Sequence, residues 1–158
     1  MLALPERIGP KPQTTSCAPH EQLDQNPSAH VYEKFKGSAF NFPGVERRPS
    51  IISVPGAEAM WLTKKQDHCC GEAFLIGNEF AHVHPPHDGS MHMMLPREAV
   101  GELLNRGWGE PHPMALIGVI APNAVMVYAP RDDAEVEIIL RIIETSYRFA
   151  TDGRSSPA

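Results

Sequence analysis

The sequence predicts a single α+β domain in which an antiparallel sheet of about five strands is covered by about three helices. Helical and alternating apolar patterns follow one another without a regular β-α-β repetition, and short turns of the hairpin type join the strands. A chain of 158 residues with 42% apolar and 21% charged residues also has the size and balance of one globular domain.

The two ends of the chain differ in composition from the middle. Residues 1–27 hold five prolines and many polar residues, which favours an extended N-terminal arm over a helix or a strand. Residues 151–158, TDGRSSPA, are predicted to form a flexible tail. The domain itself is therefore expected to span residues 28–150.

The first predicted element of the domain is a short helix. Ser28 can cap it, Val31 and Phe35 would share its apolar face, and Gly37 would end it. The segment that follows, FPGVERRPS, carries prolines and a glycine and is expected to be a connector.

Strands are expected next. The run IISVPGAEAMWLT predicts two short strands around Pro55 and Gly56. The segments EAFLIG and EFAHVH alternate around Gly77 and Asn78, which is typical of a hairpin. A further strand, SMHMML, is expected after the turn PPHDG.

Two helices and one strand complete the predicted domain. Pro96 suits the first position of a helix that Gly107 would stop. The segment VMVYAP predicts a buried strand. Asp132 and Glu135 then have the spacing of a capping box, and the apolar stripe after them predicts a helix running to about Tyr147.

The bulk properties of the chain exclude several classes of partner. A net charge of -5 and a pI near 5.9 disfavour nucleic acid, which needs a basic face. No run approaches the roughly 20 apolar residues of a membrane span, and the N-terminus lacks a signal-peptide pattern. A soluble cytoplasmic protein is therefore expected. The odd count of three cysteines, with Cys69 and Cys70 adjacent, indicates reduced thiols instead of disulfides.

Histidines gather in one short segment. Four of the eight histidines lie within eleven residues: His82, His84, His87 and His92. Residues two apart in a strand share a face, so His82 and His84 are expected to point the same way, with Phe80 beside them. His92 joins that face if His84 lies opposite His92 or opposite Ser90, whereas a register shifted by one sends it to the other side.

Two kinds of chemistry fit this cluster. Three neutral imidazoles, His82, His84 and His92, would form a divalent-metal site with open positions for water, oxygen or substrate. Asp88 would instead orient one histidine as a general base. The residues alone do not choose between these, and histidines on a solvent-exposed sheet face are the plain structural alternative.

Two further motifs are candidates for the walls of the same pocket. GWGEPHP places Trp108 and His112 between glycines and prolines, which is typical of a rigid pocket loop. The alternative is a helix stop followed by a turn with a buried Trp108. YAPR places Tyr128 and Arg131 just before a helix, where an anionic substrate can be met. Arg131 has a plainer alternative, which is to pair with an acidic residue at the start of its own helix.

These motifs, in this order, resemble the luciferase-domain family. The resemblance is carried by AHVHPPHDGSMHMML, GWGEPHPMA and YAPRDDAEVEIILRIIETS and covers residues 46–150. It implies an enzyme that adds dioxygen to an electron-rich hydroxypyrone without an organic cofactor, forming a peroxide that loses carbon dioxide. The turn PPHDGS departs from the family's more polar counterpart, and light emission is not assumed.

The chemistry that the resemblance implies divides the candidate residues into two groups. It needs a base to form the enolate, a positive or hydrogen-bonding group to hold that anion, and a surface on which a flat ring can stack. The catalytic candidates are His82, His84, His92, His112 and Arg131. The substrate-binding candidates are Phe80, Asp88, Trp108 and Tyr128. A divalent metal ion on His82, His84 and His92 remains an open alternative.

The leading hypothesis is therefore an oxygen-dependent enzyme that acts on a small enolic or aromatic, pyrone-like molecule. The second hypothesis is a non-catalytic module that holds a metal ion or a small ligand through the same histidines. A third is a subunit whose sheet edge or N-terminal arm docks to a partner, a second copy of the chain included.

Overall fold

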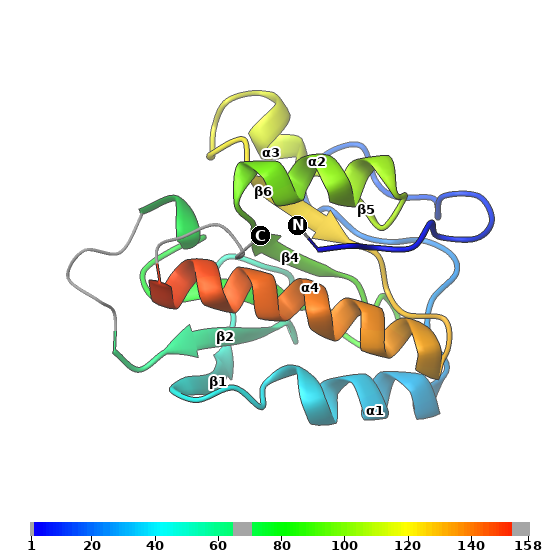
Figure 1. Ribbon diagram of the computed structural model, residues 1–158, viewed down its shortest axis with the longest axis horizontal. Coiled ribbons are helices and arrows are strands. Elements are labelled where there is room, and N and C mark those ends of the chain that lie inside the picture. Colours follow the sequence, from blue (N-terminus) through cyan, green and yellow to red (C-terminus); the bar gives the residue numbers. More distant parts are fainter. Residues whose placement is uncertain (1, 65–70, 153–158) are drawn as a thin grey trace.

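The computed structural model describes residues 2–64 and 71–152. The strands in these residues are β1 (Val45–Pro49), β2 (Glu58–Leu62), β3 (Glu79–Val83), β4 (Met91–Met94), β5 (Gly109–Pro111) and β6 (Ala124–Val127). The helices are α1 (Ala29–Ala39), α2 (Arg97–Asn105), α3 (Pro113–Leu116) and α4 (Asp133–Asp152), with a short 3-10 helix, η1 (Gly71–Ala73). The strands form one antiparallel sheet in the order β1-β2-β3-β4-β6-β5, so the predicted α+β class is confirmed (Figure 1).

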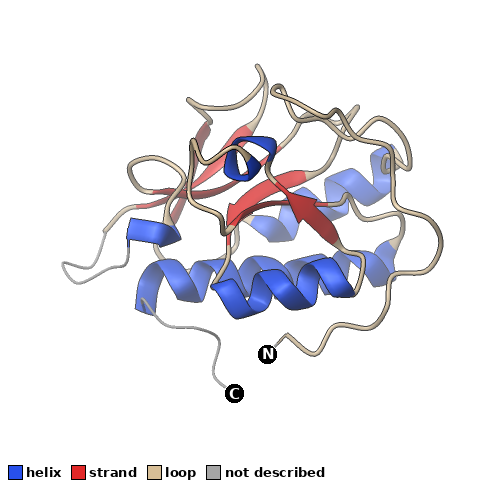
Figure 2. Ribbon diagram, turned by 90° about the horizontal axis from the view of Figure 1, so that it is seen from above, coloured by secondary structure: helices blue, strands red, loops and turns tan. Residues whose placement is uncertain are grey.

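The sheet has two unlike faces. The longer helices lie together on one side, and short α3 lies on the other side among loops (Figure 2). Alternation along the strands sends Met91 and Met93 of β4, with Val125 and Val127 of β6, into the core beneath the helices. The residues between them, such as His92, face the loops.

Helix α1 begins where the sequence predicts and ends later. Its N-cap is Ser28, whose side chain accepts a hydrogen bond from the backbone N–H of Val31. The helix continues through Gly37 to Ala39, because Gly37 does not take up the positive φ that ends a helix at glycine. Phe35 is fully buried on the inner face.

The later helices begin close to the predicted positions. Pro96 is the N-cap of α2, one residue before the first helical position predicted for it, and Gly107 follows the helix with φ +80°. Asp132 accepts the backbone N–H of Glu135 at 2.8 Å at the start of α4. Helix α4 runs on to Asp152 instead of ending near Tyr147, because buried Phe149 and Ala150 extend its apolar face. The first two residues of the predicted tail are therefore helical.

Three expectations about the strands are wrong. The expected connector contains edge strand β1, which pairs with β2 from Val45↔Leu62 to Pro49↔Glu58. Its polar sequence, VERRP, is typical of a protected sheet edge. Such a strand has no alternation of apolar residues by which the sequence could predict it. The segment before Pro55 is a series of bends. EAFLIG holds the end of η1 and a loop instead of a strand, although Ile76 and Glu79 form an isolated antiparallel bridge across the predicted turn. Ala73 and Phe74 reach the core from that loop.

The N-terminal segment lies along the domain. The backbone N–H groups of Leu2 and Leu4 donate to the Glu102 carboxylate of α2, each at 2.8 Å. Further along, Gln22 accepts the backbone N–H of Ala129 at 2.9 Å. These contacts tie residues from both ends of the segment to the folded core.

Two further expectations concern the surroundings of the chain. Among the described residues, no helix is both long and apolar enough to cross a membrane. Cys17 is free and exposed, whereas Cys69 and Cys70 lie outside the described residues.

Candidate active site

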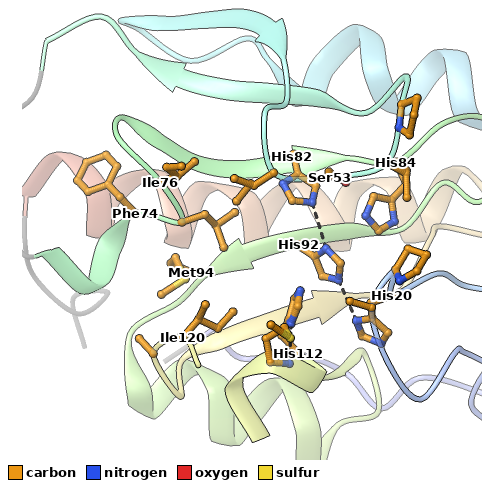
Figure 3. Close-up of a pocket in the computed structure, with 18 residues that line it drawn as sticks. His20, Ser53, Phe74, Ile76, His82, His84, His92, Met94, His112 and Ile120 are labelled. Atoms are coloured by element: carbon orange, nitrogen blue, oxygen red, sulfur yellow. Dashed lines mark hydrogen bonds between the residues drawn. The ribbon is translucent and has the colours of Figure 1, made fainter. Parts of the chain in front are cut away.

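Three histidines meet on the loop side of the sheet. His82 of β3 lies directly opposite His92 of β4, and the backbone N–H of His84 donates to the carbonyl of Ser90 at 2.9 Å. This is one of the registers that the sequence left open, and it puts His82, His84 and His92 on one face. The ring centroids of His84 and His92 are 4.7 Å apart, and those of His82 and His92 are 5.1 Å apart (Figure 3).

A β-bulge changes which residue accompanies them. Met60 of β2 pairs with Ala81, but the next residue, Trp61, pairs with Glu79, so the register skips Phe80. The expectation that Phe80 lies beside His82 is therefore wrong, because the bulge turns Phe80 into the apolar core under α4. Glu79 takes its place, with its Oε2 2.8 Å from Nδ1 of His82.

Asp88 lies behind His84 instead of in the pocket wall. Its Oδ2 is 3.1 Å from Nδ1 of His84, and its Oδ1 accepts the backbone N–H and the hydroxyl of Ser90. Burial by itself would raise the pKa of Asp88, but the hydrogen bonds from His84 and Ser90 outweigh burial and lower it. Asp88 therefore lies where it can orient His84, and the general-base role that the sequence suggested for such a histidine stays a prediction.

The site continues into residues that the sequence did not single out. Nδ1 of His20, from the N-terminal segment, is 2.8 Å from Nε2 of His92. Nε2 of His20 is 2.9 Å from Oε2 of Glu110 on β5. Burial by itself would raise the pKa of Glu110, but the hydrogen bonds from His20, Thr14 and Tyr128 lower it. No local pattern could have identified His20, because more than seventy residues separate it from its partner in the chain.

His112 borders the same site, but the GWGEPHP segment is more regular than a loop. It contains edge strand β5 and leads into α3, of which His112 is the N-cap. The ring centroids of His112 and His92 are 4.4 Å apart. Burial, together with the other histidines, lowers the pKa of His112 to about 4, so its ring is neutral at pH 7.

The remaining candidates lie away from the pocket. Trp108 is in the core on the helix side, and its Nε1 donates to the carbonyl of Pro5 at 2.7 Å. Arg131 pairs with Glu135 of its own helix at 2.5 Å, which is the plainer alternative. Tyr128 is buried, and its hydroxyl donates to Oε1 of Glu110 at 3.0 Å, so it supports the site from behind.

A pocket of about 880 Å³ opens beside the histidines (Figure 3). Its apolar walls include Ile52, Val54, Phe74, Ile76, Met94 and Ile120. Its lining also contains five imidazoles: His20, His82, His84, His92 and His112. Burial lowers the pKa of His82 and lowers that of His92 well below its usual value, so both rings are neutral at pH 7.

The fold and the site define a small α+β protein with a buried histidine pocket beside its sheet. Residues 77–146 match the family model described as the luciferase domain. The resemblance to the luciferase-domain family that its motifs predict is therefore confirmed.

Similar proteins extend this match beyond the domain. The chain is 31% identical to a protein named Luciferase from Armillaria ostoyae over 166 aligned positions, which cover 94% of this chain and 62% of that protein. It is 37% identical to a protein named Luciferase from Neonothopanus nambi over 76 positions, covering 47% of this chain and 28% of that protein. The chain thus spans less than two thirds of the length of these relatives. No solved structure matches it.

Proposed function

We propose that this protein is an oxygen-dependent enzyme that acts on a small enolic or aromatic, pyrone-like molecule without an organic cofactor. The observation that carries the proposal is an apolar pocket in which the polar groups are mainly neutral, buried imidazoles. A soluble, cytoplasmic location remains a prediction.

The pocket suits a flat apolar molecule with an ionisable oxygen. Its volume lies in the range of about 300–1,000 Å³ that is usual for small-molecule sites. Walls such as Ile52, Phe74 and Ile120 favour an apolar body and dissolved oxygen. The histidines lie together at one side of it, so an enolic oxygen is the part of the substrate that would meet them (Figure 3).

The reaction that fits these groups begins with loss of the enol proton to a histidine nitrogen. The enolate carbon then gives two electrons to dioxygen as a carbon–oxygen bond forms, which oxidises the carbon and reduces dioxygen to a peroxide. The peroxide takes the proton back, so one substrate and one dioxygen give one hydroperoxide. His112 can donate its Nε2–H to the anion, because its Nδ1 accepts the backbone N–H of Met114 at 3.0 Å.

The named relatives support this class of chemistry. The name Luciferase denotes an enzyme that emits light, and one relative with this name aligns over 94% of this chain. The histidine segment lies within residues 77–146, which match the luciferase-domain model. We extend only the oxygen chemistry to this chain, since a shared domain can act on a different substrate.

The proposal is tested by oxygen consumption. Purified protein is mixed with a panel of hydroxypyrones and phenols in an oxygen electrode, and product mass is followed in parallel. We expect substrate-dependent oxygen uptake by the wild type and a loss of about a hundredfold or more in His84→Ala, since general acid–base groups contribute that much. His30→Ala is the matched control, because His30 is exposed on α1 and far from the pocket.

Two results would contradict the proposal. One is full oxygen uptake in His82→Ala, His84→Ala and His92→Ala alike. The other is no uptake across the panel by folded wild-type protein that binds the same compounds, which would favour the alternative of a non-catalytic ligand-binding module. Circular dichroism confirms that each variant is folded.

A further inference from the structure

The hydrogen bonds around the site fix which nitrogen of each histidine carries a proton. A carboxylate only accepts, so Nδ1 of His82 donates to Glu79. The Ser90 hydroxyl gives its own proton to Asp88, so it accepts from Nδ1 of His84, 3.0 Å away, and Oδ2 of Asp88 lies 3.1 Å from the same nitrogen. In its neutral form an imidazole has one N–H, so Nε2 of His82 and Nε2 of His84 then keep their lone pairs. Both lone pairs are available on the inner side of the cluster.

The same reasoning applies to His92 through His20. Nε2 of His20 donates to the Glu110 carboxylate, so Nδ1 of a neutral His20 is an acceptor. Nε2 of His92 therefore donates to His20, and Nδ1 of His92 keeps its lone pair. Each of the three histidines is thus anchored at its outer nitrogen by a carboxylate, directly or through one further imidazole.

Three lone pairs consequently face one another. Nε2 of His82 and Nδ1 of His92 are 3.0 Å apart, and one nitrogen from each of His82, His84 and His92 lies within 4.8 Å of the others. Lone pairs at this distance repel unless a cation lies between them. A single proton would bridge one pair only and would leave the third nitrogen without a partner.

The carboxylates around the cluster also favour a cation at its centre. The carboxylates of Glu79, Asp88 and Glu110 lie at its outer ends, and the first two are fully buried. Their side-chain partners in the described part of the chain are hydroxyl groups and imidazoles, and no lysine or arginine is among them. Buried carboxylates without a positive partner are costly, and a divalent ion at the centre would offset that cost.

We propose that Nε2 of His82, Nε2 of His84 and Nδ1 of His92 bind one divalent first-row transition-metal ion. Imidazole ligands suit such ions, and carboxylates bonded to the outer nitrogens of metal-binding histidines are the usual second layer of these sites. Two nitrogens 3.0 Å apart, each about 2.0–2.1 Å from a metal ion, subtend about 90°, the angle between neighbouring ligands in an octahedral site. The remaining positions face the pocket.

His112 does not belong to the metal site, although one nitrogen each from His20, His92 and His112 also lies within 4.8 Å. Nδ1 of His112 accepts the backbone N–H of Met114, so its Nε2 carries the proton and has no lone pair for a metal. Nδ1 of His20 is used in the same way by His92. His20 and Glu110 are therefore positioning residues for His92.

The metal site adds a candidate catalyst to the proposed function. Only the catalytic role of the ion rests on that function, whereas metal binding does not. A bound ion would lower the pKa of an enolic oxygen that contacts it, and His82, His84 and His92 would then act as ligands in place of a base. Metal binding itself is measured without substrate, so it can fail or succeed independently of oxygen uptake.

The experiment measures the metal content of the full chain. Protein purified without chelator, and protein reloaded with Fe²⁺, Co²⁺ or Zn²⁺ and then desalted, is analysed by mass spectrometry for metals. We expect about one ion per chain in the wild type and a loss of at least about tenfold in occupancy for His84→Ala and His92→Ala. Metal addition should also raise the melting temperature of the wild type, because the ion binds the folded chain.

Matched variants separate this site from the alternatives. His112→Ala should keep the full metal content, and His20→Ala should weaken metal affinity by about 10–100-fold without abolishing it, as loss of an outer partner does. His30→Ala is the surface control. A variant with Cys17→Ser, Cys69→Ser and Cys70→Ser should keep the ion, which excludes thiol ligands.

Three outcomes would overturn the metal site. The first is folded wild-type protein that holds no metal after reloading and shows no shift in melting temperature. The second is loss of metal in His112→Ala with full retention in His84→Ala, which would assign the ion to His20, His92 and His112 instead. The third is loss of metal only in the cysteine variant. If His84→Ala does not fold, His84→Gln replaces it, and direct titration of the wild type with Zn²⁺ still decides.

Discussion

The two faces of the sheet are built from alternate residues of the same strands, yet one forms the apolar core and the other lines the histidine pocket. On the helix face, Met91, Met93 and Val127 are buried among aliphatic side chains under α4 and α1. On the loop face, His82 and His92 are equally buried, but their outer nitrogens have defined hydrogen-bond partners in Glu79 and His20.

The difference shows how stability and chemistry can be separated by one residue along a strand. The helix face stabilises the fold by burying apolar side chains. That stabilisation depends on the size and packing of the side chains and little on their orientation. The loop face depends on direction, because a buried imidazole or carboxylate is tolerated only when its partner is correctly placed. Substitutions on the two faces should therefore differ in kind as well as in size.

The largest loss of stability is expected on the helix face. Ile142→Ala removes a fully buried side chain of α4 and should lower the free energy of unfolding by about 2–5 kcal/mol. Urea unfolding followed by circular dichroism measures it, and oxygen uptake per folded molecule should not change. Glu137→Ala, on the exposed side of the same helix, should stay within about 0.5 kcal/mol of the wild type. A loss below about 1 kcal/mol in Ile142→Ala would show that this face is loosely packed.

A smaller loss with a larger change in the site is expected on the loop face. Asp88→Ala removes the acceptor of the Ser90 backbone N–H and hydroxyl and the carboxylate beside Nδ1 of His84, which should cost about 1–3 kcal/mol. The Nδ1–H resonance of His84 should also shift in NMR spectra, because only the Ser90 hydroxyl is left to accept it. His87→Ala in the same turn is the control, since His87 is exposed. An unchanged His84 resonance in Asp88→Ala would refute the orienting role of Asp88.

The smallest effect is expected at the sheet edge, where charges are partly exposed. Hydrogen bonds first from Arg47 and then from Lys36 lower the pKa of Glu58 from 4.5 to about 2, against the opposing effect of burial. A carboxylate with a lowered folded-state pKa stabilises the fold above about pH 4.5, and this stabilisation is lost as the pH falls towards about 2.

Glu58→Gln should therefore lower the unfolding free energy by about 1 kcal/mol at pH 7, a value reduced by solvent screening, and the difference should shrink below about pH 4.5. Urea unfolding at a series of pH values measures it. Glu144→Gln removes an exposed pair with Arg148 on α4 and should have less effect. A difference that grows on acidification would contradict the assignment.

Much of the fold could be predicted from local pattern. Ser28, Pro96 and Asp132 mark the starts of helices. The Ser28 and Asp132 side chains accept free backbone N–H groups of the first turn, and the proline ring fixes a φ that suits a helix start. Strand β1 could not be recognised, because an edge strand exposed on both faces needs no apolar alternation. The apolar residues Ala73 and Phe74 led to the opposite error, a strand predicted where there is none, because a loop can also bury apolar residues.

The candidate site was predictable only where strand parity applies. The spacing of His82 and His84 places them on one face, and the observed register adds His92. The bulge at Phe80 breaks that parity and brings Glu79 to the histidines, which the pattern of residues does not reveal.

By itself the sequence determined the α+β class, the helix caps, the family resemblance and the histidine segment, because these follow from neighbours a few residues apart. Only the tertiary structure decided which acids and which further histidine complete the cluster. His20 and Glu110 come from distant parts of the chain and meet His92 through the packing of the N-terminal segment against the sheet edge. Such contacts depend on the path of the whole chain, so no pattern of neighbouring residues predicts them.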